Sequence, residues 1–187
     1  MRDITLFKHE GDLFFKIINK KEDVTFDCDG IIVDADEKES RRTIEFIKPK
    51  DKKMKIAVVG RDDAFNRRAL ETLKINYLIS PELTEQKDSL KQRSSGMNDF
   101  MAKLARDKNI IIIEGLNFVS RQNDRKMRAK LLSRIIQNIK ICRKNKCEIR
   151  LASFAKTEDE IIGEKERQSI GFSLGMSSQQ VKKCCEF

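Results

Sequence analysis

The sequence predicts one α/β domain over residues 1–187, built as a (β/α) barrel similar to a TIM barrel or as a barrel-like open sheet. Short β-branched runs alternate with longer stretches in which apolar residues recur at helical spacing, and this alternation indicates β-α-β units around a parallel sheet. Ile110 to Ile113 are four isoleucines in a row, which is typical of a strand buried on both faces. About six or seven strand-helix units, with no glycine-rich phosphate loop after the first strand, fit a barrel or a barrel-like open sheet better than a doubly wound sheet.

The strands are placed by compact apolar runs that stop at a polar residue or a glycine. The run at residues 30–33 stops at Asp34, and the run at residues 56–59 stops at Gly60. We expect strands at residues 3–7, 30–33, 56–59, 77–79, 110–113 and 148–154.

The helices are placed by apolar residues three or four positions apart and by residues that can cap a first turn. Asp62 or Asp63, Asn98 and Thr157 each stand where a side-chain oxygen can accept from the free N–H groups of a helix start. Pro49, which has no N–H group, is expected to stop the helix that precedes it. We expect helices at residues 12–20, 37–47, 62–73, 97–108, 124–144 and 158–174, and a short last one that begins at Ser177.

The charge of the chain is unevenly distributed. The sequence carries 39 Lys and Arg against 30 Asp and Glu, a formal net charge of +9. Residues 61–150 hold 21 basic and 11 acidic residues, whereas the segments on either side are close to neutral. Concentrated positive charge favours a polyanionic partner such as nucleic acid. The charge-rich composition of proteins from hot habitats or AT-rich genomes is the alternative explanation.

The residue inventory argues against most kinds of hydrolytic site. A zinc or polynuclear site with imidazole ligands needs several histidines, and this chain has only His9. No serine has a histidine base beside it in the sequence, and no P-loop motif occurs. Four acids follow expected strand ends and leave two alternatives open, a carboxylate-held Mg²⁺ site or ordinary helix caps. These acids are Asp34, Asp36, Glu82 and Glu114.

The cysteines and the hydropathy pattern indicate a cytoplasmic protein. Five cysteines form no CxxC pair, and an odd number without a secretory signal indicates reduced thiols. The adjacent Cys184 and Cys185 are expected to be buried apolar filler. No apolar run approaches the roughly 20 residues that a membrane-spanning helix needs, so no membrane partner is expected.

The basic residues gather in expected loops and at the start of the longest expected helix. The first group is Arg61, Arg67, Arg68, Lys87, Lys91 and Arg93, and the second is Arg121, Arg125, Lys126, Arg128 and Lys130. Cations at a helix start oppose the helix dipole, so the second group is locally unfavourable. Phosphates of a nucleic acid would explain it, and a solvated basic face is the alternative.

The order and spacing of several short motifs resemble the component 3 protein subunit of archaeal ribonuclease P, which is related to the eukaryotic p30-type subunit. The similar segments are Asn66-Arg67-Arg68-Ala69, Tyr77-Leu78-Ile79-Ser80-Pro81-Glu82, Ser95-Gly96-Met97-Asn98, Met101 to Ala105, Asn109 to Asn117, Arg128 to Arg143, Leu151 to Ala155, and Leu174-Gly175-Met176. Asp99 stands where the family often has histidine, and Ile162-Gly163-Glu164 replaces a common Arg-Ser-Pro turn.

This resemblance implies a distorted barrel similar to PHP-type metal phosphoesterases but without their metal-binding histidines. In the family, the RNA subunit catalyses removal of the 5′ leader from precursor tRNA, and the protein supports RNA folding and substrate handling. The implied partners are ribonuclease P RNA, precursor tRNA, the component 2 protein in a heterotetramer, and the other protein subunits. The chain itself is expected to bind no cofactor, whereas the RNA-based holoenzyme requires Mg²⁺.

Two functions therefore stay open. The first is a non-catalytic RNA-binding subunit of ribonuclease P that is inactive in isolation and has no catalytic or metal-binding residue. The alternative is a small metal-dependent phosphodiesterase or hydrolase on the same barrel. For the first function, RNA contacts are expected at Arg61, Arg68, Lys91, Arg93, Ser95, Asn98, Lys103, Arg121, Arg125 and Arg128.

Overall fold

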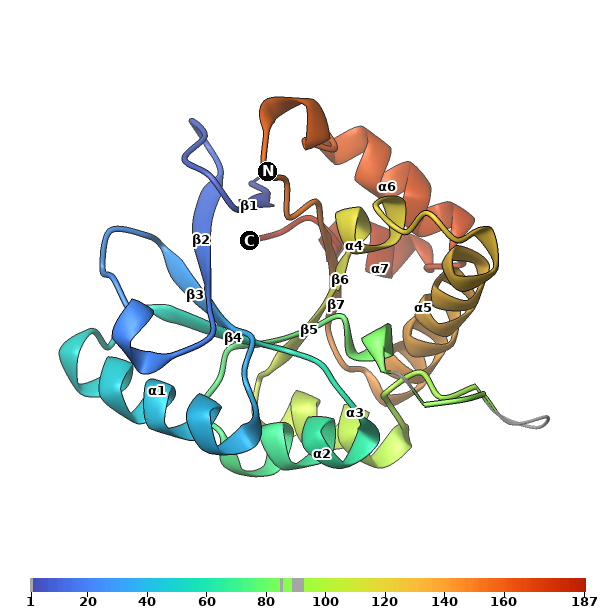
Figure 1. The fold of residues 1–187 in the computed structure, drawn as a ribbon. Helices are drawn as coiled ribbons and strands as arrows, with labels where there is room; N and C mark the ends of the chain where they lie inside the picture. Colours follow the sequence, from blue (N-terminus) through green and yellow to red (C-terminus); the bar gives the residue numbers. More distant parts are fainter. Residues whose placement is uncertain (1, 85, 89–92) are drawn as a thin grey trace.

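Seven parallel strands form one sheet that curls into a nearly closed barrel, with the helices outside it (Figure 1). The computed structural model describes residues 2–84, 86–88 and 93–187. The strands are β1 (Ile4–Thr5), β2 (Leu13–Ile18), β3 (Gly30–Val33), β4 (Lys55–Val59), β5 (Tyr77–Ile79), β6 (Ile111–Gly115) and β7 (Ile149–Ala152), and they pair in the order of the chain. The predicted α/β barrel is confirmed.

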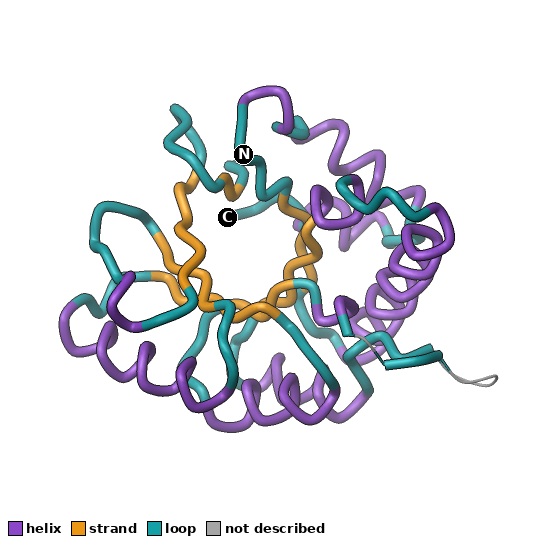
Figure 2. Tube along the Cα trace, in the orientation of Figure 1, coloured by secondary structure: helices purple, strands orange, loops and turns teal. Residues whose placement is uncertain are grey.

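Helices follow most of the strands and cover the outer face of the ring (Figure 2). They are α1 (Glu37–Lys50), α2 (Asp63–Thr72), α3 (Asp99–Asp107), α4 (Leu116–Ser120), α5 (Arg125–Asn145), α6 (Glu164–Ser173) and α7 (Ser178–Lys183). Short 3-10 turns lie at η1 (Lys21–Asp23), η2 (Pro81–Leu83) and η3 (Glu158–Glu160). In the part of the chain that the structure describes, no helix combines the length and the apolar character needed to cross a membrane.

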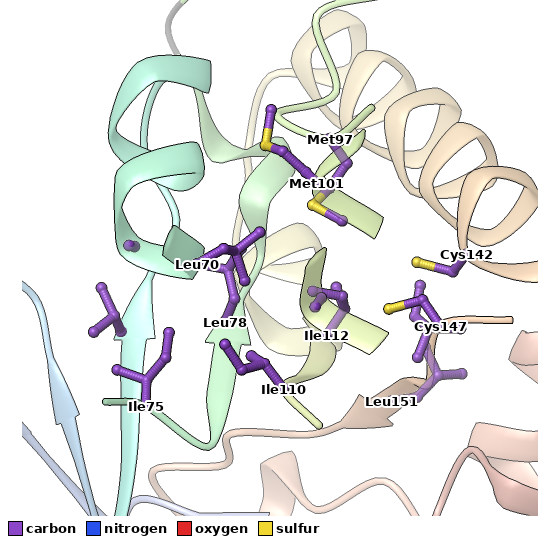
Figure 3. Packing of buried hydrophobic residues seen from close by; sticks show 14 of the residues in the cluster. Leu70, Ile75, Leu78, Met97, Met101, Ile110, Ile112, Cys142, Cys147 and Leu151 are labelled. Atoms are coloured by element: carbon purple, nitrogen blue, oxygen red, sulfur yellow. The ribbon is translucent and has the colours of Figure 1, made fainter. Parts of the chain in front are cut away.

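The strands are buried on both faces because side chains of successive residues point in opposite directions. Ile32 and Ile113 lie in the core inside the barrel, whereas Ile31 and Ile112 lie in the larger core between the sheet and the helices. Figure 3 shows this outer core, in which Ile112 packs among residues of α2, α3 and α5. The expectation that the isoleucine run forms a central strand is confirmed, since β6 pairs with β5 and β7.

The C-terminal cysteines belong to the same outer core. Cys184 and Cys185 are fully buried, and all five cysteines are free thiols. Their predicted role as buried apolar filler is confirmed.

The ring is brought together where β1 meets the residues that follow β7. Thr5 forms a parallel bridge with Ala155, and the N–H of Phe154 donates to the carbonyl of Ile4 at 3.0 Å. A buried ion pair lies behind this seam, with Asp3 Oδ1 2.5 Å from Nη1 of Arg167. The seam uses single bridges and side chains in place of a regular ladder, so it is the irregular part of the barrel.

The prediction of a helix at residues 12–20 is wrong, because this segment forms strand β2. Its apolar residues do recur at helical spacing, but the run Leu13–Ile18 is rich in aromatic and β-branched residues that suit a strand. β2 pairs in parallel with β3 over four residue pairs, and Phe15 fills the barrel interior opposite Gly30. A Cβ atom on Gly30 would lie 2.4 Å from the Phe15 ring, so the glycine makes room for the ring. Pairing with β3 thus determines the conformation of this segment, although its apolar residues recur at helical spacing.

Three further boundaries differ from the sequence-based expectation. Helix α1 continues through Pro49, which lies near its end. The helix expected at 158–174 is split into η3 and α6, because Ile161 and Gly163 adopt extended conformations between them. β7 ends at Ala152, and Phe154 has a φ of 50°, which does not continue a strand. The short helix α4 was not expected at all.

The two-sided burial of β6 can be tested by truncating one of its side chains. Ile112→Ala should lower the free energy of unfolding by about 2–5 kcal/mol, because a fully buried isoleucine would leave a cavity. The matched control is Ile17→Ala in β2, where the isoleucine is 40% exposed and a loss of at most about 1 kcal/mol is expected. Urea denaturation measures both. Equal losses in the two variants would contradict the central position of β6.

Candidate nucleic-acid interface

The expected binding residues lie mainly at the carboxyl edge of the barrel, in the segments that follow β4, β5 and β6. Asn66 joins the first two of these segments from beneath. Its Oδ1 accepts from the N–H of Arg61 at 2.7 Å, and its Nδ2 donates to the carbonyls of Arg61 and Gly96 at 3.1 and 3.0 Å. The Asn66 side chain is fully buried, so it acts as an internal support and not as a surface contact.

The segment after β5 leaves the barrel and returns to the same point. We call residues 82–95 the arm, of which the structure describes 82–84, 86–88 and 93–95. In Figure 1 its two sides run next to each other, away from the ring. Gly96 closes the base with a φ of 71°, and a Cβ atom there would lie 1.9 Å from the carbonyl oxygen of Pro81. The positive φ favours glycine, and the close approach leaves no room for a Cβ atom.

The outgoing side of the arm is held by Arg134 of helix α5. This guanidinium is fully buried and makes five hydrogen bonds, all of them to residues of the arm. Nη1 donates to the carbonyls of Glu82 and Thr84 at 2.9 and 2.8 Å. Nη2 and Nε donate to Asp88 Oδ1 at 2.8 and 3.0 Å, and Nη2 also donates to the carbonyl of Gln86. Every N–H group of the guanidinium therefore has an acceptor.

The returning side of the arm is held by the next turn of the same helix. Gln137 Nε2 donates to the carbonyl of Arg93 at 3.2 Å, and Asn138 Nδ2 donates to the carbonyl of Ser95 at 3.1 Å. Asp88 joins the two sides, because its Oδ1 also accepts from the N–H of Ser94 at 2.9 Å. Burial raises the pKa of Asp88, but the Arg134 hydrogen bonds outweigh it, so the pKa lies below its ordinary 3.8 and Asp88 remains a carboxylate.

Exposed cations stand on the arm and on the first turns of α5, next to each other. Lys87 and Arg93 are exposed on the arm, and Lys130 of α5 approaches the arm at the carbonyl of Gln86, 3.5 Å away. Arg125, Lys126 and Arg128 are exposed at the start of α5. Within the described residues, none of these six cations forms an ion pair. We call the six residues the basic surface.

Two contacts explain how the start of α5 tolerates its cations. Asp124 caps the helix, with its Oδ1 accepting from the N–H of Lys126 at 2.8 Å. Arg128 donates through Nε to the carbonyl of Gln122 at 3.0 Å and through Nη2 to the carbonyl of Ser120 at 3.4 Å. Neither contact supplies a counter-charge to the Arg128 guanidinium, so the surface stays strongly positive.

Three other expected cations are neutralised by acids of the chain. Arg61 lies 2.9 Å from Asp34, Arg68 lies 2.5 Å from Glu37, and Nε of Arg121 donates to Glu160 at 3.0 Å. The Arg121 hydrogen bonds lower the pKa of the Glu160 carboxyl to about 2, so this pair is charged at neutral pH. These arginines are thus less available to an external phosphate than the six residues of the basic surface.

The other residues that were expected to contact RNA lie in several different parts of the fold. Ser95 is buried, and its hydroxyl donates to the carbonyl of Met97. Asn98 caps α3 by accepting from the N–H of Met101 at 2.9 Å. Both side chains shape the base of the arm. Lys103 is exposed on α3, and Lys91 lies outside the described residues.

A hollow of about 690 Å³ opens at the same edge, between the ends of β3, β4 and β5. Its polar lining includes Asp34, Arg61, Asp62 and Gln86. Asp34 is paired with Arg61, and Asp62 caps α2 by accepting from the N–H of Phe65 at 2.7 Å. Among the residues that the structure describes, no three His, Cys, Asp or Glu side chains gather in a way that could hold a metal ion.

The other strand-end acids are divided between a helix cap and a buried pair. Asp36 caps α1 by accepting from the N–H of Glu39 at 2.8 Å. Glu82 and Glu114 are fully buried beside each other, in the layer between the sheet and α5. Glu114 Oε1 accepts from Asn138 Nδ2 at 3.2 Å, but both carboxyl oxygens of Glu82 and Oε2 of Glu114 lack a donor within the described part of the chain.

A proton on one of the two carboxyl groups would allow Glu82 and Glu114 to form a hydrogen bond with each other. Arg134 favours the charged form of Glu82, but burial opposes it, and two adjacent carboxylates in an apolar layer disfavour being charged at the same time. Burial raises the pKa of Glu82 above its ordinary 4.5. Burial together with the negative charge of Glu82 raises the pKa of Glu114 well above that value. The pair therefore ties the end of β6 to the base of the arm while keeping at least one neutral carboxyl.

The residues of α5 that hold the arm were not predicted from the sequence, although their positions on the helix could have indicated them. Arg134 and Asn138 fall on the apolar stripe of α5 that contains Leu131, Ile135 and Ile139. A polar residue on the buried face of an amphipathic helix needs a partner inside the protein. The sequence does not show which partner this is.

Comparison with known proteins gives matches at the level of structure only. No model of a known protein family matches the chain, and no curated protein sequence matches it. A chain in the cryo-EM structure of an archaeal ribonuclease P with mature tRNA aligns over 100% of this chain and 87% of its own length, with a TM-score of 0.75 and 18% identity.

Enzymes with a related barrel align less closely. The ochratoxinase of A. niger has a TM-score of 0.58 and 12% identity over 84% of this chain and 38% of its own. An amidohydrolase has a TM-score of 0.57 and 12% identity over 83% of this chain and 40% of its own. This chain therefore spans less than half the length of these two enzymes. At such low identities, all three similarities show a shared barrel fold.

The shared proton predicts a specific dependence of stability on pH. Carboxyl groups whose pKa is raised by folding contribute most to stability below their ordinary pKa of 4.5, and this contribution is lost as the pH rises toward the raised value. Glu114→Gln removes the titration while its amide can still accept from Asn138 and donate to Glu82. Between about pH 5 and 8, the stability of this variant relative to the wild type should therefore rise.

Urea denaturation at several pH values measures this difference. Glu148→Gln, which changes an exposed glutamate, serves as the control and should show no comparable trend. A stability difference between Glu114→Gln and the wild type that stays constant with pH would show that no proton is shared.

Proposed function

We propose that this chain is a non-catalytic, RNA-binding protein subunit of ribonuclease P, the ribonucleoprotein that removes the 5′ leader from precursor tRNA. The observation that carries the proposal is the basic surface, five exposed cations and the half-buried Lys130, none of which forms an ion pair among the described residues. The similarity of the whole chain to a chain of an archaeal ribonuclease P supports the choice of this particular complex.

The basic surface suits RNA because phosphates supply the missing counter-charge. Each cation that contacts a phosphate releases condensed counterions from the RNA, so binding weakens as salt increases. The start of α5 is also a place where cations are unfavourable next to the positive end of the helix dipole. A bound phosphate would reverse this effect, since helix starts and arginine side chains both favour anions.

The proposed partners are ribonuclease P RNA, precursor tRNA, the component 2 protein in a heterotetramer, and the other protein subunits. In this complex the RNA would perform the cleavage and would require Mg²⁺, and this chain would contribute no cofactor of its own. A cytoplasmic location is part of the same proposal. Copurification of a large structured RNA with the tagged protein would support these assignments, and recovery of the protein without RNA at low salt would count against them.

A first prediction concerns the basic surface. Arg93→Ala, Arg125→Ala and Arg128→Ala should each weaken binding of a ribonuclease P RNA transcript and should each reduce the slope of log K against log salt by about one unit. Lys182→Ala, which removes an exposed lysine of α7, is the control and should leave the slope unchanged. If Lys182→Ala reduces the slope as much as the other three, the positive charge acts as a diffuse surface and the proposed interface is wrong.

A second prediction concerns catalysis. The isolated protein should not cleave precursor tRNA in the presence of Mg²⁺, whereas addition of ribonuclease P RNA and the partner proteins should give cleavage at the 5′ leader. The assay follows the release of the leader on a denaturing gel. Cleavage by the protein alone that is lost in Asp34→Asn or Asp62→Asn would favour the alternative function, a metal-dependent phosphodiesterase that uses the hollow at the carboxyl edge.

A further inference from the structure

We propose that Arg134 is a positioning residue for RNA binding, which holds the arm so that Lys87 and Arg93 form one surface with the start of α5. This inference rests on the proposed RNA-binding function. It assigns a role in that function to a residue that has no exposed surface and cannot touch RNA itself.

The hydrogen bonds of Arg134 all end on the arm. All five reach residues 82–88, and none reaches another α-helix or a strand of the barrel. Three of the acceptors are backbone carbonyls at every second position of the chain, those of Glu82, Thr84 and Gln86. Arg134 thus fixes the backbone of the outgoing side up to the residue that precedes Lys87.

Beyond Leu83, where η2 ends, the described part of the arm has no helix or strand to order it. Its outgoing and returning sides are joined by Asp88, which accepts from Ser94, and by the hydroxyl of Ser94, which donates to the carbonyl of Lys87 at 2.9 Å. Asp88 is itself held by two hydrogen bonds from Arg134. The positions of both Lys87 and Arg93 therefore depend on the same guanidinium.

An arm that is ordered before binding lowers the free-energy cost of binding RNA. If residues are disordered before binding, ordering them on the RNA costs conformational entropy. This cost makes the free energy of binding less favourable and so weakens the affinity. An arm that is already held by Arg134 presents its two cations at fixed distances from those of α5, so less affinity is lost. A buried charged side chain contributes little to stability compared with an apolar one, and this favours a positioning role over a purely stabilising one.

The experiment uses a matched pair of buried arginines. Arg134→Lys removes most of the hydrogen bonds to the arm and retains the positive charge. Arg167→Lys is the control, because Arg167 is equally buried and also binds a carboxylate and backbone carbonyls, but at the barrel seam around Asp3 and Leu151. Each variant is checked for folding by circular dichroism and by its melting temperature, and Asp88→Asn is a second, milder variant of the same contact.

The readout is binding of a ribonuclease P RNA transcript at several salt concentrations. Arg134→Lys and Asp88→Asn should reduce affinity about tenfold or more and should lower the salt slope by up to two units, as the contacts of Lys87 and Arg93 are lost. In the background Lys87→Ala/Arg93→Ala, the change Arg134→Lys should add no further loss, because it acts through those two residues. Trypsin should also cleave Arg134→Lys faster after Lys87 and Arg93. Arg167→Lys should lower the melting temperature without changing the slope.

The outcomes separate this inference from the proposed function. A wild-type protein that does not bind the transcript would overturn the proposed function and the role of Arg134 with it. Binding by the wild type together with an unchanged slope in folded Arg134→Lys and Asp88→Asn would overturn the positioning role alone. An equal loss of slope in Arg167→Lys would likewise show that general destabilisation, and not the arm, lowers the affinity.

Discussion

A guanidinium that is cut off from water must direct each of its N–H groups to an acceptor, and in this protein that requirement organises the carboxyl edge of the barrel. Arg134 meets it entirely with residues of the arm. The carbonyls after β5 consequently turn toward α5, the arm lies along that helix, and Gln137 and Asn138 reach its returning side. One buried charge thus determines how an otherwise irregular segment leaves and re-enters the barrel.

A second polar feature lies directly beneath the first. The carboxyl group of Glu82 makes no hydrogen bond with Arg134, since Arg134 donates to the backbone carbonyl of Glu82. Its carboxyl group instead adjoins Glu114 at the end of β6, which accepts from Asn138 of α5. Strand, arm and helix therefore meet in a small polar layer inside an apolar core. Apolar packing alone tolerates many arrangements, whereas these hydrogen bonds are satisfied in one arrangement.

The ion pairs show which of the basic residues carry charge that is not already matched by an acid of the same chain. Arg61, Arg68 and Arg121 are as basic as the residues on the arm, but each is matched by an acid from a different part of the chain. Six cations that form no ion pair within the described residues lie on the arm and on the first turns of α5. An excess of basic residues in a sequence segment therefore indicates a polyanionic partner, while the location of the contact depends on which cations remain without an acidic neighbour.

The amino-acid sequence by itself determined the barrel, most of its elements and the region of positive charge. The isoleucines of β6 and the run before Asp34 predict buried parallel strands, because two-sided burial requires apolar residues without alternation. The caps at Asp62 and Asn98 were also predictable, since they act within one turn. Tertiary structure decided the rest. Residues 13–18 form a strand because β3 and Gly30 offer a partner that no local pattern reveals. The partners of Arg134 and Glu114 come from segments about 20 to 50 positions away, and hydrogen bonds over such separations depend on the fold that brings the segments together.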